Sequence, residues 1–360
     1  MDISKKQVSL LLFIITTVSK FLILPSVYSN YAAQDVWFAG LLNFALDGAL
    51  LATALLVLKK FEGRTLYEIF SDTIGKFGAN AVFILYAAYF LLKATVPLFE
   101  QRNFIEITLY ETLPSVITFL PFFFVAFYAC VKGLKVMGRT AEMLIWPSVL
   151  GLLLAIGLAF VSVDFNNLQP VLKNPLKQTL TGSYSGLIWY GQPLMLFFLT
   201  GKIRKEKHFN AWATVAFCAA AFLSEVIFVS FTAIYGVLAP REIYALPKMT
   251  KYGITLANIL RFDYIATLLL LTSSTLSLTV PLIFAVECLC EVFGENKRTI
   301  FSAAIAVSGA ILTVVMRLRF REIVMLFEKY FTPIMCVLCY IIPLITLIFG
   351  RKNNEKILEK

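Results

Sequence analysis

The chain has 360 residues, of which 59% are hydrophobic and 15% are charged, and its mean hydropathy is +0.81. Soluble domains carry about 25% charged residues, so this composition excludes an ordinary soluble protein. The formal net charge is +10, but no segment between the apolar stretches is long enough to fold into a basic surface for nucleic acid. The positive charge instead indicates contact with the anionic lipids of a bilayer.

Ten apolar stretches follow one another along the chain, and each is of the order of the 20 or so residues that cross a hydrocarbon core as a helix. They are continuously apolar, which excludes the alternating strands of a membrane barrel. The sequence therefore predicts an all-α integral membrane protein with ten transmembrane helices, whose residues 1–360 form a single transporter-like domain. The stretches are residues 8–27, 36–58, 80–108, 113–131, 143–163, 182–200, 212–238, 264–290, 299–316 and 331–349.

The first stretch contains a lysine in its interior and a proline near its end, at position 25. A charge is costly at the bilayer centre and proline removes a backbone hydrogen bond, so we expect this helix to be broken. The lysine would also interrupt the apolar core of a signal peptide, so we expect the helix to be retained. Backbone groups freed in a membrane persist where they line a cavity or meet a ligand. The candidate ligand-binding residues here are Ser19, Lys20, Phe21 and Leu22.

The second and third stretches carry charged residues, each of which needs a partner, a cavity or a neutral form. Asp47, in the middle of the second stretch, is a candidate partner for Lys93 in the third. Arg102 and Glu106 are four residues apart on one helical face and can form a clasp, with Glu100 as a second acceptor. Such a clasp fixes helix packing more often than it lines a route for solute, and both roles stay open.

The sixth stretch contains glycines in residues 182–186 and again at Gly191, which precedes Gln192 and Pro193. A polar, proline-containing connection, residues 164–181, separates it from the first five stretches. Five spans in each half invert the second half, so we expect a 5+5 inverted repeat with broken first and sixth helices. Breaks at corresponding positions favour a ligand site over two ordinary kinks. The residues expected to line it are Tyr184, Ser185, Gly186, Trp189, Tyr190 and Gln192.

Hydroxyl side chains are concentrated in residues 272–279 of the eighth stretch. Ser274 and Thr275 can complete the ligand site opposite Lys20, or they can bond to carbonyl groups of their own helix. Cys336 and Cys339 form a C-x-x-C pair without a second pair of ligands, so we interpret them as small apolar residues that serve packing. No disulfide, metal or cofactor is expected.

Shorter ordered segments are predicted between the stretches. Residues 65–80 are expected to form a short amphipathic helix at the cytoplasmic interface of the membrane, and residues 320–330 have a similar pattern. Residues 239–260 are long enough to fold as a lid of one or two short helices. Most lysine and arginine residues outside the stretches fall on one side of the membrane, which predicts a multi-pass protein with both termini in the cytoplasm.

Four motifs occupy characteristic places in this pattern. Leu-Ile-Leu-Pro at residues 22–25 closes the broken first helix, and Phe-Glu-Gln-Arg at residues 99–102 is followed by Glu106. Phe-Asn-Asn-Leu-Gln-Pro-Val-Leu follows the fifth stretch at residues 165–172, and Arg-Phe-Asp at residues 261–263 opens the eighth. With its ten stretches, the chain resembles the B-subunit family of spore germinant receptors (GerAB type), in the amino acid–polyamine–organocation transporter superfamily. The resemblance implies a nutrient sensor of the spore inner membrane that acts with A- and C-type receptor subunits.

The chain departs from the family pattern where a ligand would be held. Lys20 replaces the small residue that is usual in the first break, Gln192 and Pro193 follow Gly191 where a glutamate is usual, and no tryptophan lies near Leu270. The fold implied by the resemblance therefore carries over better than the ligand.

Two functions fit these observations. The first is a receptor B subunit that binds a small, amino acid-like nutrient at the breaks of the first and sixth helices and shifts between conformations that its partners read. The alternative is an autonomous proton-coupled amino acid permease, which needs the same fold and pocket. An enzyme is not expected, because no nucleophile or metal ligands surround the single histidine, His208. The sequence leaves open the ligand, the coupling ion and whether Lys20 replaces a cation, accepts a proton or is structural.

Overall fold

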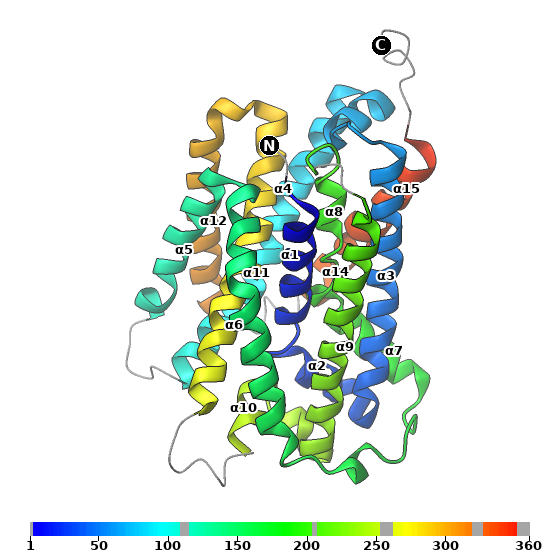
Figure 1. Cartoon of the computed structure of the whole chain (residues 1–360), viewed down its shortest axis with the longest axis vertical. Coiled ribbons are helices and arrows are strands. Elements are labelled where there is room, and N and C mark those ends of the chain that lie inside the picture. Colours follow the sequence, from blue (N-terminus) through cyan, green and yellow to red (C-terminus); the bar gives the residue numbers. More distant parts are fainter. Residues whose placement is uncertain (1–2, 109–114, 204–206, 253–261, 319–326, 351–360) are drawn as a thin grey trace.

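The computed structural model describes residues 3–108, 115–203, 207–252, 262–318 and 327–350 (Figure 1). Regular structure in these ranges is helical, apart from an isolated bridge between Ile3 and Ile203. This agrees with the predicted all-α class, because backbone groups in a hydrocarbon core must be bonded within their own segment.

Long helices form most of the molecule, and shorter ones connect or interrupt them. The long helices are α3 (Val36–Lys60), α4 (Leu66–Thr108), α5 (Ser115–Lys132), α6 (Leu134–Phe160), α9 (Phe209–Tyr235), α11 (Phe262–Phe293) and α12 (Arg298–Leu318). The shorter ones are α1 (Lys5–Val18), α2 (Leu24–Ala32), α7 (Leu176–Gly186), α8 (Leu194–Phe198), α10 (Ala245–Tyr252), α14 (Thr332–Cys336) and α15 (Ile342–Phe349).

Seven helical segments of the described residues are long and apolar enough to cross a membrane, which is consistent with a multi-pass membrane protein. The sequence predicted ten spans. The first and sixth stretches are divided among α1, α2, α7 and α8, the longest of which has 14 residues, fewer than the roughly 20 that a span needs. The fourth stretch begins at residue 113, outside the described ranges.

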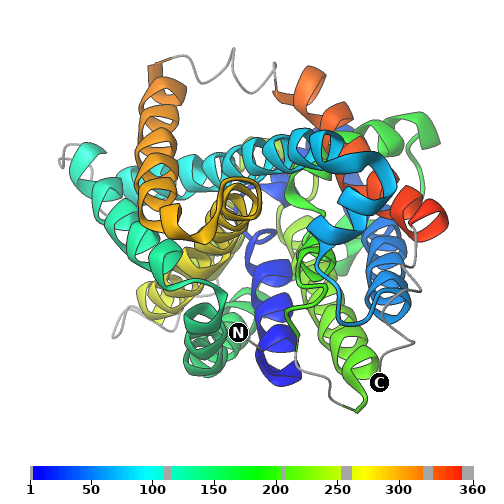
Figure 2. The same cartoon turned by 90° about the horizontal axis from the view of Figure 1, so that it is seen from above.

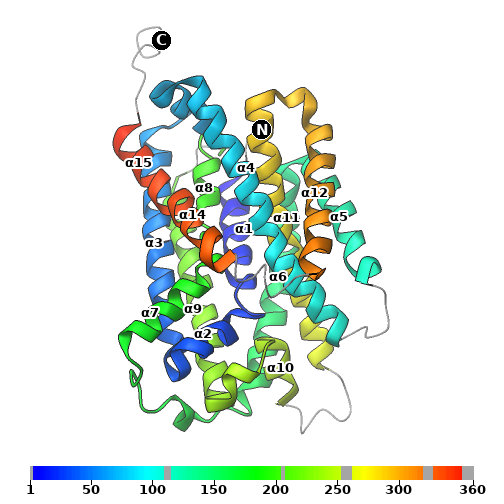
Figure 3. The same cartoon turned by 180° about the vertical axis from the view of Figure 1, so that it is seen from behind.

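Helix α1 lies between α6 and α9 (Figures 1 and 2). It packs against α6, α9 and α11, and α11 in turn packs against α4, α6 and α12. Seen from behind, α14 and α15 lie across the group formed by α3, α7 and α9 (Figure 3). The start of α1 and the end of α15 lie at the same end of the bundle (Figure 1).

Large apolar side chains remain exposed around the bundle, among them Phe124, Met143, Trp146 and Phe222, each at least two-thirds exposed. Exposed apolar surface on this scale marks contact with a membrane or a partner. Because it is spread over the outer faces of α5, α6 and α9, we interpret it as surface that contacts lipid.

The predicted amphipathic segment, residues 65–80, is the first part of α4. Gly75 is non-helical (φ 79°, ψ 162°) and separates this part from the long span. Leu66, Ile69 and Phe70 are buried, as the predicted apolar face requires, whereas Ile74 next to the kink is half exposed. Most of the similar segment at residues 320–330 lies outside the described residues.

The connection after α6 is bonded to the neighbouring elements, which explains the family-like motif at residues 165–172. Asn167 Nδ2 donates to the carbonyl oxygen of Ala233 at 2.8 Å. Asp35, just before α3, accepts from the backbone N–H of Leu172 (2.7 Å) and of Asn174 (3.1 Å). The motif therefore ties the two halves of the chain together, and Asp35 is a contributor that sequence reasoning missed.

Candidate functional site

The first interruption separates α1 from α2 at residues 19–23, and Pro25 lies in the first turn of α2, where a missing N–H breaks no helical bond. Lys20 in this segment is fully buried. Its ammonium group donates to the carbonyl oxygen of Thr16 (2.9 Å) and to Gln192 Oε1 (2.9 Å). The lysine therefore donates a hydrogen bond to a carbonyl group at the end of α1 and bonds to Gln192, which lies between α7 and α8.

The second interruption lies between α7 and α8. A 3-10 turn (Leu187–Trp189) is followed by the extended residue Tyr190 and then by Gly191, whose φ is +87°. Glycine reaches this region without steric cost, and a Cβ at Gly191 would also lie only 3.0 Å from the sulfur of Cys339. The backbone here therefore requires glycine.

Asp47 and Lys93 both bind the backbone of this second interruption. The Asp47 carboxylate accepts the Gly191 N–H at 2.8 and 3.1 Å, and the Lys93 ammonium group donates to the carbonyl oxygens of Ile188 and Tyr190. Within the described part of the chain, Asp47 and Lys93 form no direct ion pair. The two charges instead satisfy an amide and two carbonyls that the interruption frees from the helical ladder.

The side chain of Gln192 joins the two interruptions. Its Nε2 atom donates to Ser19 Oγ (3.0 Å) and to the carbonyl oxygen of Trp189 (2.7 Å), while its Oε1 atom accepts from Lys20. The Lys20 nitrogen also lies 4.4 Å from the centre of the Tyr190 ring, within the range of a cation–π interaction. These residues, which the sequence placed in one candidate site, are brought into contact.

Other predicted residues of the sixth stretch have packing roles. Tyr184 is 42% exposed. Gly186 makes room for Tyr28, because a Cβ there would lie 2.2 Å from the tyrosine ring. Asn43 of α3, which sequence reasoning did not single out, donates to the Tyr28 hydroxyl at 2.7 Å and accepts from Ser183 Oγ at 2.6 Å.

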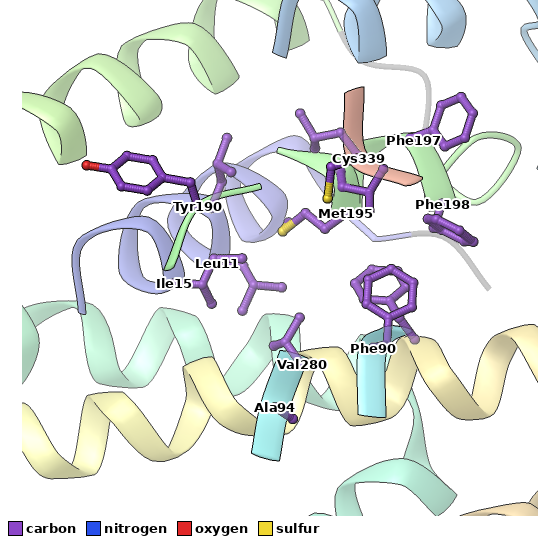
Figure 4. Packing of buried hydrophobic residues seen from close by; sticks show 14 of the residues in the cluster. Leu11, Ile15, Phe90, Ala94, Tyr190, Met195, Phe197, Phe198, Val280 and Cys339 are labelled. Atoms are coloured by element: carbon purple, nitrogen blue, oxygen red, sulfur yellow. The ribbon is translucent and has the colours of Figure 1, made fainter. Parts of the chain in front are cut away.

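A cavity of about 90 Å³ lies between α1, α4, α8 and α11. One water needs roughly 10–15 Å³ by this kind of measure, so the cavity can take a small solute. Most of its wall is apolar, and Figure 4 shows Ile15, Phe90, Met195 and Val280 converging on it from these four helices. Of the residues predicted from the sequence, those lining it are Ser19, Phe21, Leu22, Lys93, Glu100, Gln192 and Ser274.

The remaining predicted ligand residues do not line this cavity: Lys20, Tyr184, Ser185, Gly186, Trp189, Tyr190 and Thr275. Ser274 and Thr275 both donate to the carbonyl oxygen of Leu271 in their own helix, at 2.8 and 3.1 Å. The cavity therefore touches both interruptions and extends from them toward α4 and α11.

Of the charged residues predicted on α4, Lys93 and Glu100 line this cavity, whereas Arg102 does not. Glu100 is buried, and its Oε2 atom accepts from Trp189 Nε1 at 3.1 Å. Arg102 is 2% exposed. The side chain of Glu106, its predicted partner, lies outside the described residues, so the clasp stays a prediction.

Helix α10 covers the first interruption, in the segment predicted to form a lid. The N–H groups of Ala245 and Leu246 donate to the carbonyl oxygens of Leu22 (2.7 Å) and Phe21 (3.2 Å). The side chain of Leu246 lines the cavity. The lid helix thus satisfies backbone groups of the interruption and closes one wall of the cavity.

An ion network joins the end of α8 to α11 and α12. Lys202 lies 2.9 Å from carboxylate oxygens of both Glu287 and Glu291, and Arg298 lies 2.6 Å from Glu287. Burial lowers the pKa of Lys202, but Glu287 and Glu291 more than offset this, and the pKa rises above its ordinary value. The lysine therefore stays charged and fixes the end of α8.

Apolar helices around an interior cavity, with buried charges that bond the backbone between the shorter helices, are consistent with a helical multi-pass membrane protein of the permease-like class. Within the described part of the chain, no group of three His, Cys, Asp or Glu side chains is placed to hold a metal ion. The family model of the spore germination proteins matches residues 2–322, and the chain belongs to that family.

Individual relatives are more distant. The chain is 26% identical over 194 residues to "Spore germination protein A2" of Bacillus subtilis (strain 168), which covers 53% of this chain and 52% of that protein. It is 24% identical over 227 residues to "Spore germination protein KB" of the same organism, which covers 61% of this chain and 60% of that protein. The matched regions thus span roughly half to three-fifths of these relatives.

Proposed function

We propose that the protein is the nutrient-sensing B-type subunit of a spore germination receptor. The observation that carries the proposal is that residues 2–322 match the family of spore germination proteins. The interior cavity supports it, because Ser19 and Gln192, one from each interruption, line this cavity. A small, amino acid-like nutrient binds in this region. The bound nutrient shifts the equilibrium between two conformations of the protein. The size of this shift is set by the difference between the affinities of the two conformations for the nutrient.

The finer architecture belongs to the same proposal. The pairs α1–α2 and α7–α8 are the broken first and sixth helices of a ten-span, 5+5 inverted repeat. Two features support this: each pair is interrupted by non-helical residues, and the interruptions meet where Lys20 bonds to Gln192. The protein lies in the spore inner membrane with both termini in the cytoplasm, as the distribution of lysine and arginine indicates.

Lys20 acts in this proposal as a fixed cation. Transporters with broken helices offer the freed carbonyl oxygens to a bound cation, and the ammonium groups of Lys20 and Lys93 occupy such carbonyl oxygens here. The protein is therefore expected to respond to its ligand without sodium.

The partners are A- and C-type receptor subunits, which read the conformation of this chain. Deleting the gene should abolish the germination of spores in response to at least one nutrient of an amino acid panel, and the wild-type gene should restore it. An intact response to every nutrient would contradict the proposal. Uptake of labelled amino acids by proteoliposomes that contain the chain alone would favour the rival function, an autonomous proton-coupled permease.

A further inference from the structure

Two buried oxygen atoms on the cavity wall have no hydrogen-bond partner among the described residues. They are Oε1 of Gln101, on α4, and Oγ of Ser277, on α11. Both residues line the cavity, and α4 and α11 pack directly against each other. Buried polar atoms are nearly always bonded in native proteins, so unbonded ones in residues that line a cavity indicate where a ligand or water is accepted.

Glu100 adds a carboxyl group at the same place. It precedes Gln101 on α4, lines the cavity and is 7% exposed. The hydrogen bond from Trp189 uses one of the roughly four acceptor positions of a carboxylate. The α4–α11 side of the cavity therefore offers a carboxylate, an amide oxygen and a hydroxyl oxygen to a hydrogen-bond donor.

The polar groups on the opposite side are already used. Both N–H donors of the Gln192 amide are bonded, to Ser19 and to Trp189. Lys93 uses two of its three donors on backbone carbonyl oxygens, and it lies about two helical turns from Glu100 along α4. Acceptors at the Glu100 end thus remain free, whereas donors near the interruptions are mostly consumed.

We propose that the cavity binds the primary ammonium group of its ligand at Glu100, Gln101 and Ser277, with an apolar chain of the ligand against Phe90 and Met195. This inference rests on the proposed function and adds to it that the amine, rather than the carboxylate, supplies most of the recognition. Phe90 and Met195 both line the cavity, and Figure 4 shows them on either side of an open space. A charged amine satisfies the free acceptors and balances the carboxylate that is otherwise buried.

The test uses the purified full chain in detergent and three related probes. L-Valine carries both charged groups, isobutylamine keeps its amine without the carboxylate, and 3-methylbutanoate keeps the carboxylate without the amine. Isothermal titration should find binding of L-valine and isobutylamine, and much weaker binding of 3-methylbutanoate. Glu100→Gln should weaken the binding of isobutylamine about tenfold to a hundredfold, as expected for loss of a charge-assisted hydrogen bond.

Glu100→Gln retains an oxygen that can accept from Trp189, and Ser277→Ala removes a single oxygen, so at least one of the two is expected to fold. Ser277→Ala should weaken isobutylamine binding several-fold. The matched control is Glu225→Gln, because both carboxylate oxygens of Glu225 are buried without a hydrogen-bond partner in the described part of the chain, and this residue does not line the cavity. It should leave the binding of isobutylamine unchanged.

Three results would overturn the inference: no binding of isobutylamine to the wild type, equal binding of isobutylamine and 3-methylbutanoate, or unchanged binding in the folded variants of Glu100 and Ser277. The proposed function has a separate readout. Spores without the gene can lose a nutrient response while Glu100→Gln and Ser277→Ala leave the binding of isobutylamine unchanged. That result would support the receptor function and refute the amine site.

Discussion

Asp47→Asn is expected to be the most destabilising conservative change in the interior. The carboxylate of Asp47 is fully buried, accepts the Gly191 N–H at 2.8 Å and the Tyr340 hydroxyl at 2.9 Å, and interacts electrostatically with Lys20 and Lys93. Gly191 and Tyr340 both donate to Oδ1, and the Gly191 N–H also lies 3.1 Å from Oδ2, so an asparagine that keeps its oxygen at Oδ1 places its NH₂ group against the Gly191 N–H. It also leaves two buried ammonium groups without their shared anion. Leaving a buried donor unsatisfied costs about 1–3 kcal/mol, and more where a charged group is involved, so we expect a loss of at least this size.

The assay is the denaturant-induced unfolding of the purified protein, followed by tryptophan fluorescence. The double variant Asp47→Asn/Lys20→Met should be more stable than Asp47→Asn alone, because it also removes one of the uncompensated cations. Glu225→Gln serves as the control, since its carboxylate accepts no hydrogen bond from the described residues, and it should be close to neutral. An Asp47→Asn protein as stable as the wild type would refute the view that Asp47 anchors the second interruption.

Three further changes test separate parts of the account. Gly191→Ala should destabilise the protein by about 1–2 kcal/mol or more, because the φ of Gly191 is +87° and an added Cβ would lie 3.0 Å from the sulfur of Cys339. The control Gly157→Ala should be tolerated, because a Cβ there meets nothing within 4 Å. Equal unfolding curves for the two variants would contradict this. The Lys20→Met protein should reach the membrane but lose the nutrient response that needs no sodium. If it binds a panel of amino acids as the wild type does, both with and without sodium, Lys20 has only a structural role. Lys202→Met should lower the free energy of unfolding by about 1–3 kcal/mol, because it breaks the part-buried ion network. Lys6→Met removes an exposed ion pair and should change the free energy of unfolding by less than about 1 kcal/mol. Similar losses of stability in the two variants would show that burial does not set the difference.

The sequence predicted the helical class and the family. Apolar runs, glycine and proline carry that information locally. Its ten stretches exceed the seven long apolar helices of the described residues, because residues 19–23 divide one stretch and residues 187–193 another into short helices. The ten-span repeat therefore remains a proposal beside seven helices of sufficient length in the described residues.

The partners of the buried charges were also beyond the sequence. Asp47 and Lys93 were paired in the prediction because their charges are opposite, whereas the structure directs each to backbone groups of the second interruption. Backbone acceptors have no signature in the sequence, and the rotation of each helix about its axis decides which side chains meet. Gln101 and Ser277 were missed for the same reason, since only the packing of α4 against α11 places them on one cavity.

The central claim is that a nutrient binds inside the bundle, and photo-crosslinking tests it most directly. The purified protein would be irradiated with the diazirine analogue of L-leucine, with and without excess L-leucine, and labelled peptides would be identified by mass spectrometry. The account predicts labels on the segments of α1, α4 and α11 that line the cavity, and their loss in the presence of L-leucine. Labels confined to lipid-facing residues such as Trp146 and Phe124, or labelling that L-leucine does not reduce, would contradict it.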